Sequence, residues 1–470
     1  MPPGLPCLDV GEGCLRHERA QAGLFGRVLE EHQLLVGDRQ LGPQLLEPLA
    51  RIHEAAAENR LAHSGDSTGS GAGRAPFGYR AGMGETHRHP VFTPEHDELR
   101  ESIRRFVDKE LRPHVDEWED AGYFPDDVFR RCGELGFLGL HYDERWGGAG
   151  GDLASGLVFM EELGHCGCGA IPMAVGVQTH MSTPALAEFG SDELRERYLR
   201  PAIAGEKIGA IAITEPDAGS DVAGVTTRGE REGDTWVING RKLYITNGVR
   251  ADFLTLVVQT EPGSRHRGVS LFIVDTDLPG VSVSRSLRKL GMRGSDTVEL
   301  ALDDVVVPQG NLIGGTTGEG FAQLMWQLQY ERLCGAAAGI GQADEILEET
   351  ISYARERRTF GKALGDHQVI AHKLADAATE IEAARALLYD TVWKIQEGDY
   401  PVAQISMAKK FVAQVQNRVA DACLQVHGGF GYMHEAPVSR AWRDARLQRI
   451  GAGTDEIMNE VIAKRLGISG

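Results

Sequence analysis

A glutamate lies within the apolar stretch "LQYERLCG", residues 328–335, where a carboxylate could serve as a general base. At helical spacing Glu331 follows Leu324 and Leu328 and precedes Cys334, so it falls on the apolar stripe of a helix. Removal from water raises the pKa of a carboxyl group and brings its basicity toward what proton abstraction requires. The alternative is that Glu331 pairs with an arginine inside a helical bundle.

The segments that position this glutamate follow the order α, β, α. From about residue 93 to residue 209 the apolar period is helical, and Thr93 is the expected N-cap of a first helix with Pro94 at its first position. Between about residues 210 and 307, short β-branched runs predict strands at "TWVING", "KLYITNG", "DFLTLVVQT", "GVSLFIVD" and "TVELALDDVVV". Helical periodicity then returns, with a break between two helices at about residues 361–365.

The sequence therefore predicts an α+β fold with a β domain inserted in a helical chain. We expect an N-terminal helical domain over residues 83–209, a central β domain over residues 210–310 and a C-terminal helical bundle over residues 311–470. Residues 1–82 are expected to form an extension that ends in a flexible linker, because the run "AHSGDSTGSGAGRAPFGYRAGMG" is rich in glycine and serine and has no apolar period.

Composition excludes several classes of partner. The formal charge of −19 argues against binding to nucleic acid or to an anionic membrane surface. The longest uncharged stretch, residues 163–187, contains histidines, prolines and glycines that make a membrane span improbable. The 7 scattered cysteines and the lack of a signal peptide predict reduced thiols in a cytoplasmic protein. Small molecules and proteins remain as partners.

Two other kinds of site are also unsupported by the sequence. The stretch "HCGCG", residues 165–169, has no second pair of ligands at zinc spacing, so no metal site is expected. No Gly-x-Ser-x-Gly elbow supports acyl hydrolysis.

Four stretches in register resemble the acyl-CoA dehydrogenase family, and the resemblance extends from about Phe92 to the C-terminus. They are "ITEPDAGSD" (213–221), "LYITNG" (243–248), "RRTFG" (357–361) and "QVHGGFGYMHEAPVSRAWRDARLQRIGAGTDEI" (425–457). The resemblance implies an N-terminal helical domain, a central β domain and a C-terminal four-helix bundle, with FAD bound between them. It also implies that the protein is usually a homotetramer.

The same resemblance assigns roles residue by residue. The residues implied to face the flavin ring are Ile213, Thr214, Tyr244, Ile245 and Thr246, with Ser220 between flavin and CoA. The residues implied to bind the rest of FAD, partly in a neighbouring subunit, are Arg357, Phe360, Gln368, Gln425, Gly428, Gly429, Thr454 and Glu456. Taken alone, these stretches could also be a polar turn, a core aromatic, a basic helix end and a tight turn.

One departure from the family pattern concerns the catalytic base. Many relatives carry a glutamate immediately before the Gly-Thr pair of the last motif, where this chain has Ala452. The long-chain and isovaleryl branches carry the base on an earlier helix, followed by arginine, and Glu331 with Arg332 resembles that arrangement. The resemblance further implies that Ser220, Arg332, Ala452 and Gly453 bind the substrate, the Ala452 N–H serving the thioester oxygen.

The favoured hypothesis is an FAD-dependent acyl-CoA dehydrogenase in which Glu331 removes the α-proton and an electron-transfer flavoprotein accepts the electrons. An alternative within the same fold is a flavin-dependent oxidase or monooxygenase, which fast reaction of the reduced flavin with oxygen would reveal. A third hypothesis is a non-catalytic flavin- or acyl-CoA-binding protein, in which no acyl-CoA reduces the flavin.

Overall fold

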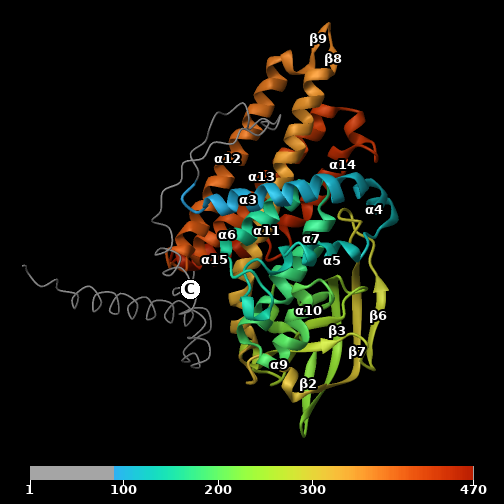
Figure 1. Ribbon diagram of the computed structural model, residues 1–470, viewed down its shortest axis with the longest axis vertical. Helices are drawn as coiled ribbons and strands as arrows, with labels where there is room; N and C mark the ends of the chain where they lie inside the picture. Colours follow the sequence, from blue (N-terminus) through green and yellow to red (C-terminus); the bar gives the residue numbers. More distant parts are fainter. Residues whose placement is uncertain (1–88, 469–470) are drawn as a thin grey trace, which may run out of the picture.

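The computed structural model describes residues 89–468, and the extension and linker predicted for residues 1–82 lie outside the described residues. A layer of short helices lies between a twisted sheet at one end and long helices at the other (Figure 1). The predicted α+β fold with the order α, β, α is confirmed. The helices that precede the sheet are α3 (Pro94–Phe106), α4 (Val115–Ala121), α5 (Asp127–Glu134), α6 (Leu153–Gly164), α7 (Ala170–Gly176), α8 (Pro184–Phe189), α9 (Asp192–Leu194) and α10 (Arg200–Ile203).

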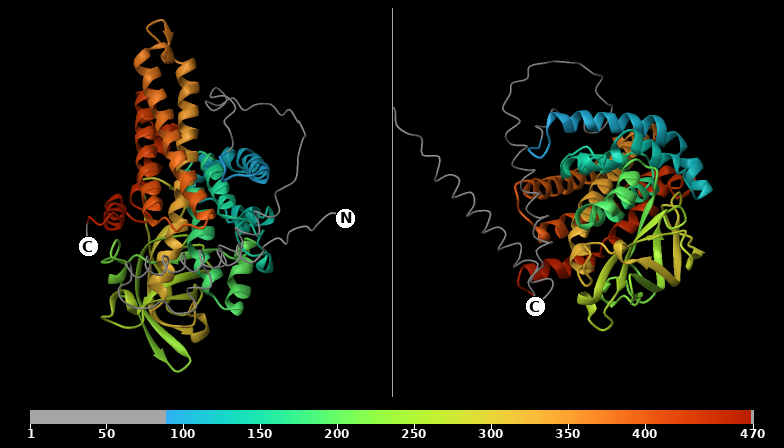
Figure 2. Two further views of the ribbon diagram at one scale, coloured as in Figure 1. Left: turned by 90° about the vertical axis from the view of Figure 1, so that its left-hand side faces the viewer. Right: turned by 60° about the horizontal axis from the view of Figure 1, so that its bottom comes forward.

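Helix α3 begins as the sequence predicts. Thr93 is its N-cap and Pro94, whose missing N–H costs nothing in the first turn, is its first residue. Ile103 and Phe106 face inward and are buried in the helical core. Helix α3 packs on α6, and Figure 2 shows it on the outer side of the helical layer.

The sheet has the strand order β1-β4-β2-β3-β7-β6, and β5 also pairs with β4 outside this order. Strand β1 is parallel to β4, whereas β3 is antiparallel to both β2 and β7. The strands are β1 (Gly209–Ala212), β2 (Arg228–Glu232), β3 (Thr235–Thr246), β4 (Phe253–Gln259), β5 (Val269–Asp275), β6 (Val281–Ser286) and β7 (Thr297–Pro308).

The prediction of two separate strands at residues 235–240 and 242–248 is wrong. Residues 235–246 form the single strand β3, and only residues 247–248 of the second run lie beyond it. The pairing of β3 with β7 shifts register between Ile238 and Gly240 and again between Lys242 and Ile245. Such bulges let one strand change the face that a side chain occupies without ending the ladder. The glycine in the first run therefore marks an irregularity within a strand, not a turn between two strands.

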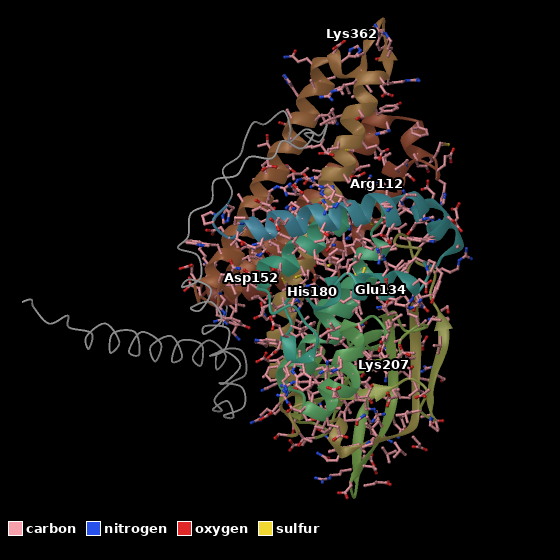
Figure 3. All side chains as sticks on the ribbon, viewed as in Figure 1. Arg112, Glu134, Asp152, His180, Lys207 and Lys362 are labelled. Atoms are coloured by element: carbon pink, nitrogen blue, oxygen red, sulfur yellow. The ribbon has the colours of Figure 1, made fainter. Side chains whose placement is uncertain are left out.

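The long helices form the other end of the molecule, and α11 joins them to the sheet. The break expected near residues 361–365 is occupied by a hairpin of β8 (Arg358–Thr359) and β9 (Lys362–Ala363), and Lys362 in this hairpin lies at the end of the bundle (Figure 3). The helices are α11 (Gly320–Glu356), α12 (Gln368–Gln396), α13 (Val402–His427), α14 (Pro437–Ala445) and α15 (Asp455–Arg465). Within residues 89–468, none of the helices has an apolar stretch that would reach across a bilayer.

Candidate active site

Glu331 lies on α11 at the boundary between two hydrophobic clusters. Leu324 and Leu328, on the turns before it, pack into the cluster shared with the β domain, whereas Leu333 and Cys334, just after it, belong to the helical core. Glu331 is only 7% exposed. Its Oε2 atom is buried and accepts no hydrogen bond from the described residues. The apolar setting expected from the sequence is therefore confirmed.

This setting changes the acidity of the carboxyl group. Burial raises the pKa of Glu331 to about 7, because the charged form loses its hydration, while the nearby cations Arg332 and Lys409 act in the opposite direction. Neither cation forms an ion pair with Glu331, and no other basic side chain in residues 89–468 does so. Within the described residues, the alternative that Glu331 forms a structural ion pair with an arginine is therefore wrong.

Arg332 and Lys409 instead hold the loop that precedes α15. The Arg332 Nε atom donates to the carbonyl of Ala452 at 3.1 Å, and Lys409 Nζ donates to the carbonyl of Gly453. Ala452 has φ 55° and Gly453 has φ 99°, so two successive residues turn in the left-handed sense. The loop that contains Ala452 and Gly453 is therefore held by Arg332, the residue that follows Glu331 on α11.

The two residues predicted beyond this loop lie at the start of α15. Thr454 is the N-cap, and its hydroxyl oxygen accepts a hydrogen bond from the N–H of Ile457 at 3.3 Å. Glu456 is exposed in the first helical turn. The structure thus places Thr454 and Glu456 on the same loop and helix start as Gly453.

The β domain contributes the segment that follows β1. Ile213 and Thr214 leave the strand half-buried, and the carbonyl of Thr214 accepts a hydrogen bond from the N–H of Leu243 on β3 at 2.8 Å. Ser220 lies farther along the same segment and is exposed. The two stretches predicted to face the flavin ring, around Thr214 and around Tyr244, are therefore neighbours in the sheet.

Tyr244 lies within the second bulge of β3. Its φ is 62° and it is 65% exposed, whereas Ile245 is buried in the core of the sheet and Thr246 pairs with Thr297 of β7. A positive φ is unusual for an aromatic residue and indicates a conformation imposed by its surroundings. The bulge presents the Tyr244 ring outward, while Ile245 can reach a ligand only through its backbone.

A second group of predicted residues lies far from Glu331. Arg357 directly follows α11, and at 1.5 Å per residue it is roughly 39 Å along the helix from Glu331. Phe360, in the β8–β9 hairpin, is 97% exposed, and Gln368 is the first residue of α12. These three residues mark the outer end of the bundle.

Gln425, Gly428 and Gly429 belong to the same outer end. They lie at the end of α13, where the ring of His427 stacks on Tyr353 of α11 with centroids 4.2 Å apart. One chain therefore brings together two groups of predicted residues, one around Glu331 and one at the outer end. It does not bring the two groups to each other.

Both groups have features that suit a flavin dinucleotide. Gly428 has φ 60° and ψ −135°, which only glycine adopts without strain, and a Cβ atom on Gly428 or Gly429 would meet nothing within 4 Å. Arg357 is exposed and forms no ion pair within the described residues, so its guanidinium can take phosphate oxygens. The outward Tyr244 ring offers an aromatic face. The residues present therefore fit the cofactor.

Lys409 is a site residue that sequence reasoning missed. It is buried on α13, and burial lowers the pKa of its ammonium group to about 8 against the opposing effect of Asp455. The available signal was its spacing, because Lys409 follows Ile405 by four residues and precedes Val412 by three, on the apolar face of a helix. Which loop it would contact could not be derived from that spacing.

Comparison with known proteins identifies relatives of the whole described region. Three family models match: acyl-CoA dehydrogenase N-terminal domain over residues 93–206, middle domain over residues 210–305 and C-terminal domain over residues 318–467. The mitochondrial long-chain specific acyl-CoA dehydrogenase of Mus musculus is 38% identical over 421 residues, covering 89% of this chain and 94% of that protein.

Solved structures agree with these matches. A probable acyl-CoA dehydrogenase from Mycobacterium abscessus superposes with a TM-score of 0.78 at 43% identity, covering 80% of this chain and 100% of that one. The FAD complex of PigA superposes with a TM-score of 0.77 at 27% identity, covering 81% of this chain and 99% of that one.

Proposed function

This chain belongs to the acyl-CoA dehydrogenase family, and we propose that it uses Glu331 as the base that begins α,β-dehydrogenation of an acyl-CoA thioester. The observation that carries the proposal is the buried, unpartnered Oε2 atom of Glu331 beside the loop that contains Ala452. A carboxylate in that loop would have been the obvious base, and alanine cannot supply one. Glu331, which precedes the arginine that holds this loop, is the carboxylate that we assign to the role.

The chemistry requires a proton and a hydride to leave neighbouring carbons. The carboxylate of Glu331 takes the α-proton, and a pKa of about 7 makes it a far stronger base than an exposed glutamate at neutral pH. When FAD, the cofactor of this family, is bound, it would supply the acceptor for the hydride that leaves the β-carbon. The electron pair of the α C–H bond becomes the new carbon–carbon double bond.

The loop before α15 is proposed to bind the thioester. Removal of the α-proton develops negative charge on the thioester oxygen, and a fixed backbone N–H stabilises that charge better than mobile water does. Arg332 and Lys409 hold two successive carbonyls of this loop, so the N–H of Ala452 belongs to a backbone whose position is fixed. Gly453, Arg332 and Ser220 complete the proposed substrate contacts.

The separation of the two groups of residues supports a cofactor site shared between subunits. Arg357 lies too far along α11 to reach a flavin placed beside Glu331 of its own chain. A second copy that presents its outer end to the first would supply the missing phosphate contacts. We therefore propose that a second copy of the chain completes the site. A homotetramer, an electron-transfer flavoprotein as acceptor and a cytoplasmic location are further expectations.

The test is anaerobic bleaching of the flavin absorbance by a panel of straight and branched acyl-CoA thioesters. The flavin of the wild-type protein is expected to bleach with at least one of them. Glu331→Gln should retain FAD, but its rate of flavin bleaching should fall by several orders of magnitude. The matched control is Glu349→Gln, because Glu349 lies on the same helix and burial also raises its pKa to about 7. Equal bleaching of Glu331→Gln and wild type would refute the assignment of the base.

The same preparation distinguishes the alternative chemistry. After substrate has reduced the flavin, air is admitted and the return of absorbance is followed. The reduced flavin of a dehydrogenase that uses a protein acceptor is expected to react slowly with oxygen. Reoxidation of the flavin as fast as catalytic turnover would instead identify an oxidase. A flavin that no thioester reduces would contradict both activities.

A further inference from the structure

An ion pair between Lys242 and Glu215 is fully enclosed in the β domain. Lys242 is 0% exposed and Glu215 is 4% exposed, and the Lys242 Nζ atom lies 2.8 Å from Glu215 Oε1. Removing two charges from water carries a large desolvation cost, so such a pair is weak evidence for stability in itself. Its retention is better explained if the pair holds a particular conformation.

The hydrogen bonds of the pair join three separate segments. Glu215 accepts from the N–H of Thr226 at 2.6 Å, from its hydroxyl at 2.7 Å and from the N–H of Thr227 at 2.9 Å, which fixes the chain just before β2. Lys242, on β3, also donates to the carbonyl of Ile213 at 3.1 Å. The pair thus ties the exit of β1 to β2 and β3.

We propose that Lys242 and Glu215 are positioning residues for the flavin: they hold the Ile213–Thr214 segment against β3 and so set the surface on which the ring lies. This inference rests on the proposed function, because the roles of Ile213, Thr214 and Tyr244 as flavin contacts belong to it. According to this proposal, neither Lys242 nor Glu215 contacts the flavin ring. Both act through the backbone that they hold.

The peptide geometry explains how the clamp works. The carbonyl of Ile213 is bound by Lys242 Nζ, and the carbonyl of Thr214 is bound by the N–H of Leu243 at 2.8 Å. Because a peptide unit is planar and trans, binding the Ile213 carbonyl turns the N–H of Thr214 to the opposite side. The N–H of Thr214, a residue implied to face the flavin ring, is therefore oriented by a lysine on the other side of the peptide unit.

The same lysine adjoins the other flavin-facing stretch. The bulge of β3 starts directly after Lys242 and contains Tyr244, whose positive φ has to be maintained by the neighbouring structure. Lys242 is thus the last regularly paired residue before the strand departs from its ladder. One buried side chain anchors both edges of the proposed flavin surface.

Two variants separate a positioning role from a merely structural one. Lys242→Met removes the donor and leaves Glu215 as a buried, uncompensated charge, so both stability and flavin geometry should suffer. The double variant Lys242→Met with Glu215→Gln removes both charges. It should recover most of the lost stability, but it still lacks the donor to the Ile213 carbonyl.

Three readouts on the intact holoenzyme test the proposal: the FAD dissociation constant from fluorescence quenching, the visible circular dichroism of the bound flavin, and denaturant unfolding. We expect Lys242→Met to weaken FAD binding at least tenfold and to change the flavin dichroism. The double variant should keep both flavin changes while its unfolding midpoint returns toward wild type. The split between stability and flavin signal is what a positioning role predicts.

The matched control is Arg385→Met. Arg385 is a buried cation on α12 that pairs with Glu161 and with Asp344 at 2.6 Å, within the helical core. It should lose stability as Lys242→Met does, while the FAD dissociation constant stays within about twofold of wild type. An equal loss of FAD affinity in this control would overturn the proposal, because any destabilised core would then do the same.

The proposal would also be overturned by unchanged FAD affinity and dichroism in Lys242→Met, or by their full recovery in the double variant. These outcomes are independent of the catalytic base. If Glu331→Gln bleached like wild type, the proposed function would fail while the flavin readouts stayed valid. If the wild-type protein bound no FAD, both proposals would fail together.

Discussion

Replacing Glu331 by glutamine should make the protein more stable at alkaline pH, although it removes the proposed base. The pKa of this carboxyl rises from its ordinary value of 4.5 to about 7 because of burial. At about 1.4 kcal/mol per pKa unit, that difference corresponds to roughly 3 kcal/mol between the charged and neutral forms. Glutamine has nearly the same shape and carries no charge at any pH.

The sign follows from proton binding. Between about pH 4.5 and pH 7 the folded protein holds a proton on Glu331 that the unfolded chain has released, so raising the pH favours unfolding. Below about pH 4.5 the carboxyl is neutral in both states and resembles glutamine. The stability advantage of Glu331→Gln should therefore be small at pH 4.5, grow as the pH approaches 7, and stay constant above it.

The assay is denaturant unfolding of wild type and Glu331→Gln at pH 5, 6, 7 and 8 with FAD in excess. Comparison of the two proteins at each pH cancels every other titrating group that they share. An advantage of about 3 kcal/mol at pH 8 that falls to about 1 kcal/mol at pH 5 is expected. If the stability difference did not depend on pH, or if Glu331→Gln were less stable than wild type at pH 8, the argument that the buried Glu331 carboxylate destabilises the fold would be refuted.

Two further predictions concern the loop before α15. Lys409→Met should move the acid limb of the pH profile of kcat/KM toward higher pH, because Lys409 lowers the pKa of Glu331. The control is Lys410→Met, which should leave the limb in place, because the ammonium group of Lys410 donates to Asn459. Gly453→Ala should destabilise the protein by about 1–3 kcal/mol, since its φ is 99° and the new Cβ would lie 2.6 Å from a methionine methyl. Ala452→Gly, at φ 55°, should instead change stability by less than about 1 kcal/mol in the same unfolding assay.

Local sequence signals were sufficient where one segment decides the outcome. The Thr93–Pro94 start of α3 and the apolar stripe around Glu331 depend on residues within two helical turns, and the structure has both. The run from Gly320 to Glu356 is helical throughout, and two of its glycines, Gly339 and Gly341, lie where α13 and α6 approach closely. Pattern and packing agree in these segments.

Features that depend on pairing between distant segments could not be predicted in the same way. The bulge at Tyr244 arises because β3 has one more residue than β7 between two paired positions, and neither strand alone encodes that mismatch. The contact of Lys409 with the Gly453 carbonyl joins α13 to a loop 44 residues farther along the sequence. Periodicity identifies a buried lysine and cannot identify its acceptor.

The position of Glu331 on a helix, and not in the loop, has an electrostatic consequence. A carboxylate at residue 452 would lie just before the N-terminus of α15, whose unpaired N–H groups favour negative charge, and close to Arg332 and Lys409. All three influences lower a carboxyl pKa. Glu331 lies eleven residues after the start of α11, away from both ends of its own helix, and the loss of water between the two clusters outweighs the effect of the same two cations. A base on the helix therefore has a higher pKa than one in the loop, where the surroundings stabilise the carboxylate anion. Arg332 and Lys409, which hold the loop, can then stabilise the negative charge that develops on the thioester oxygen of the substrate.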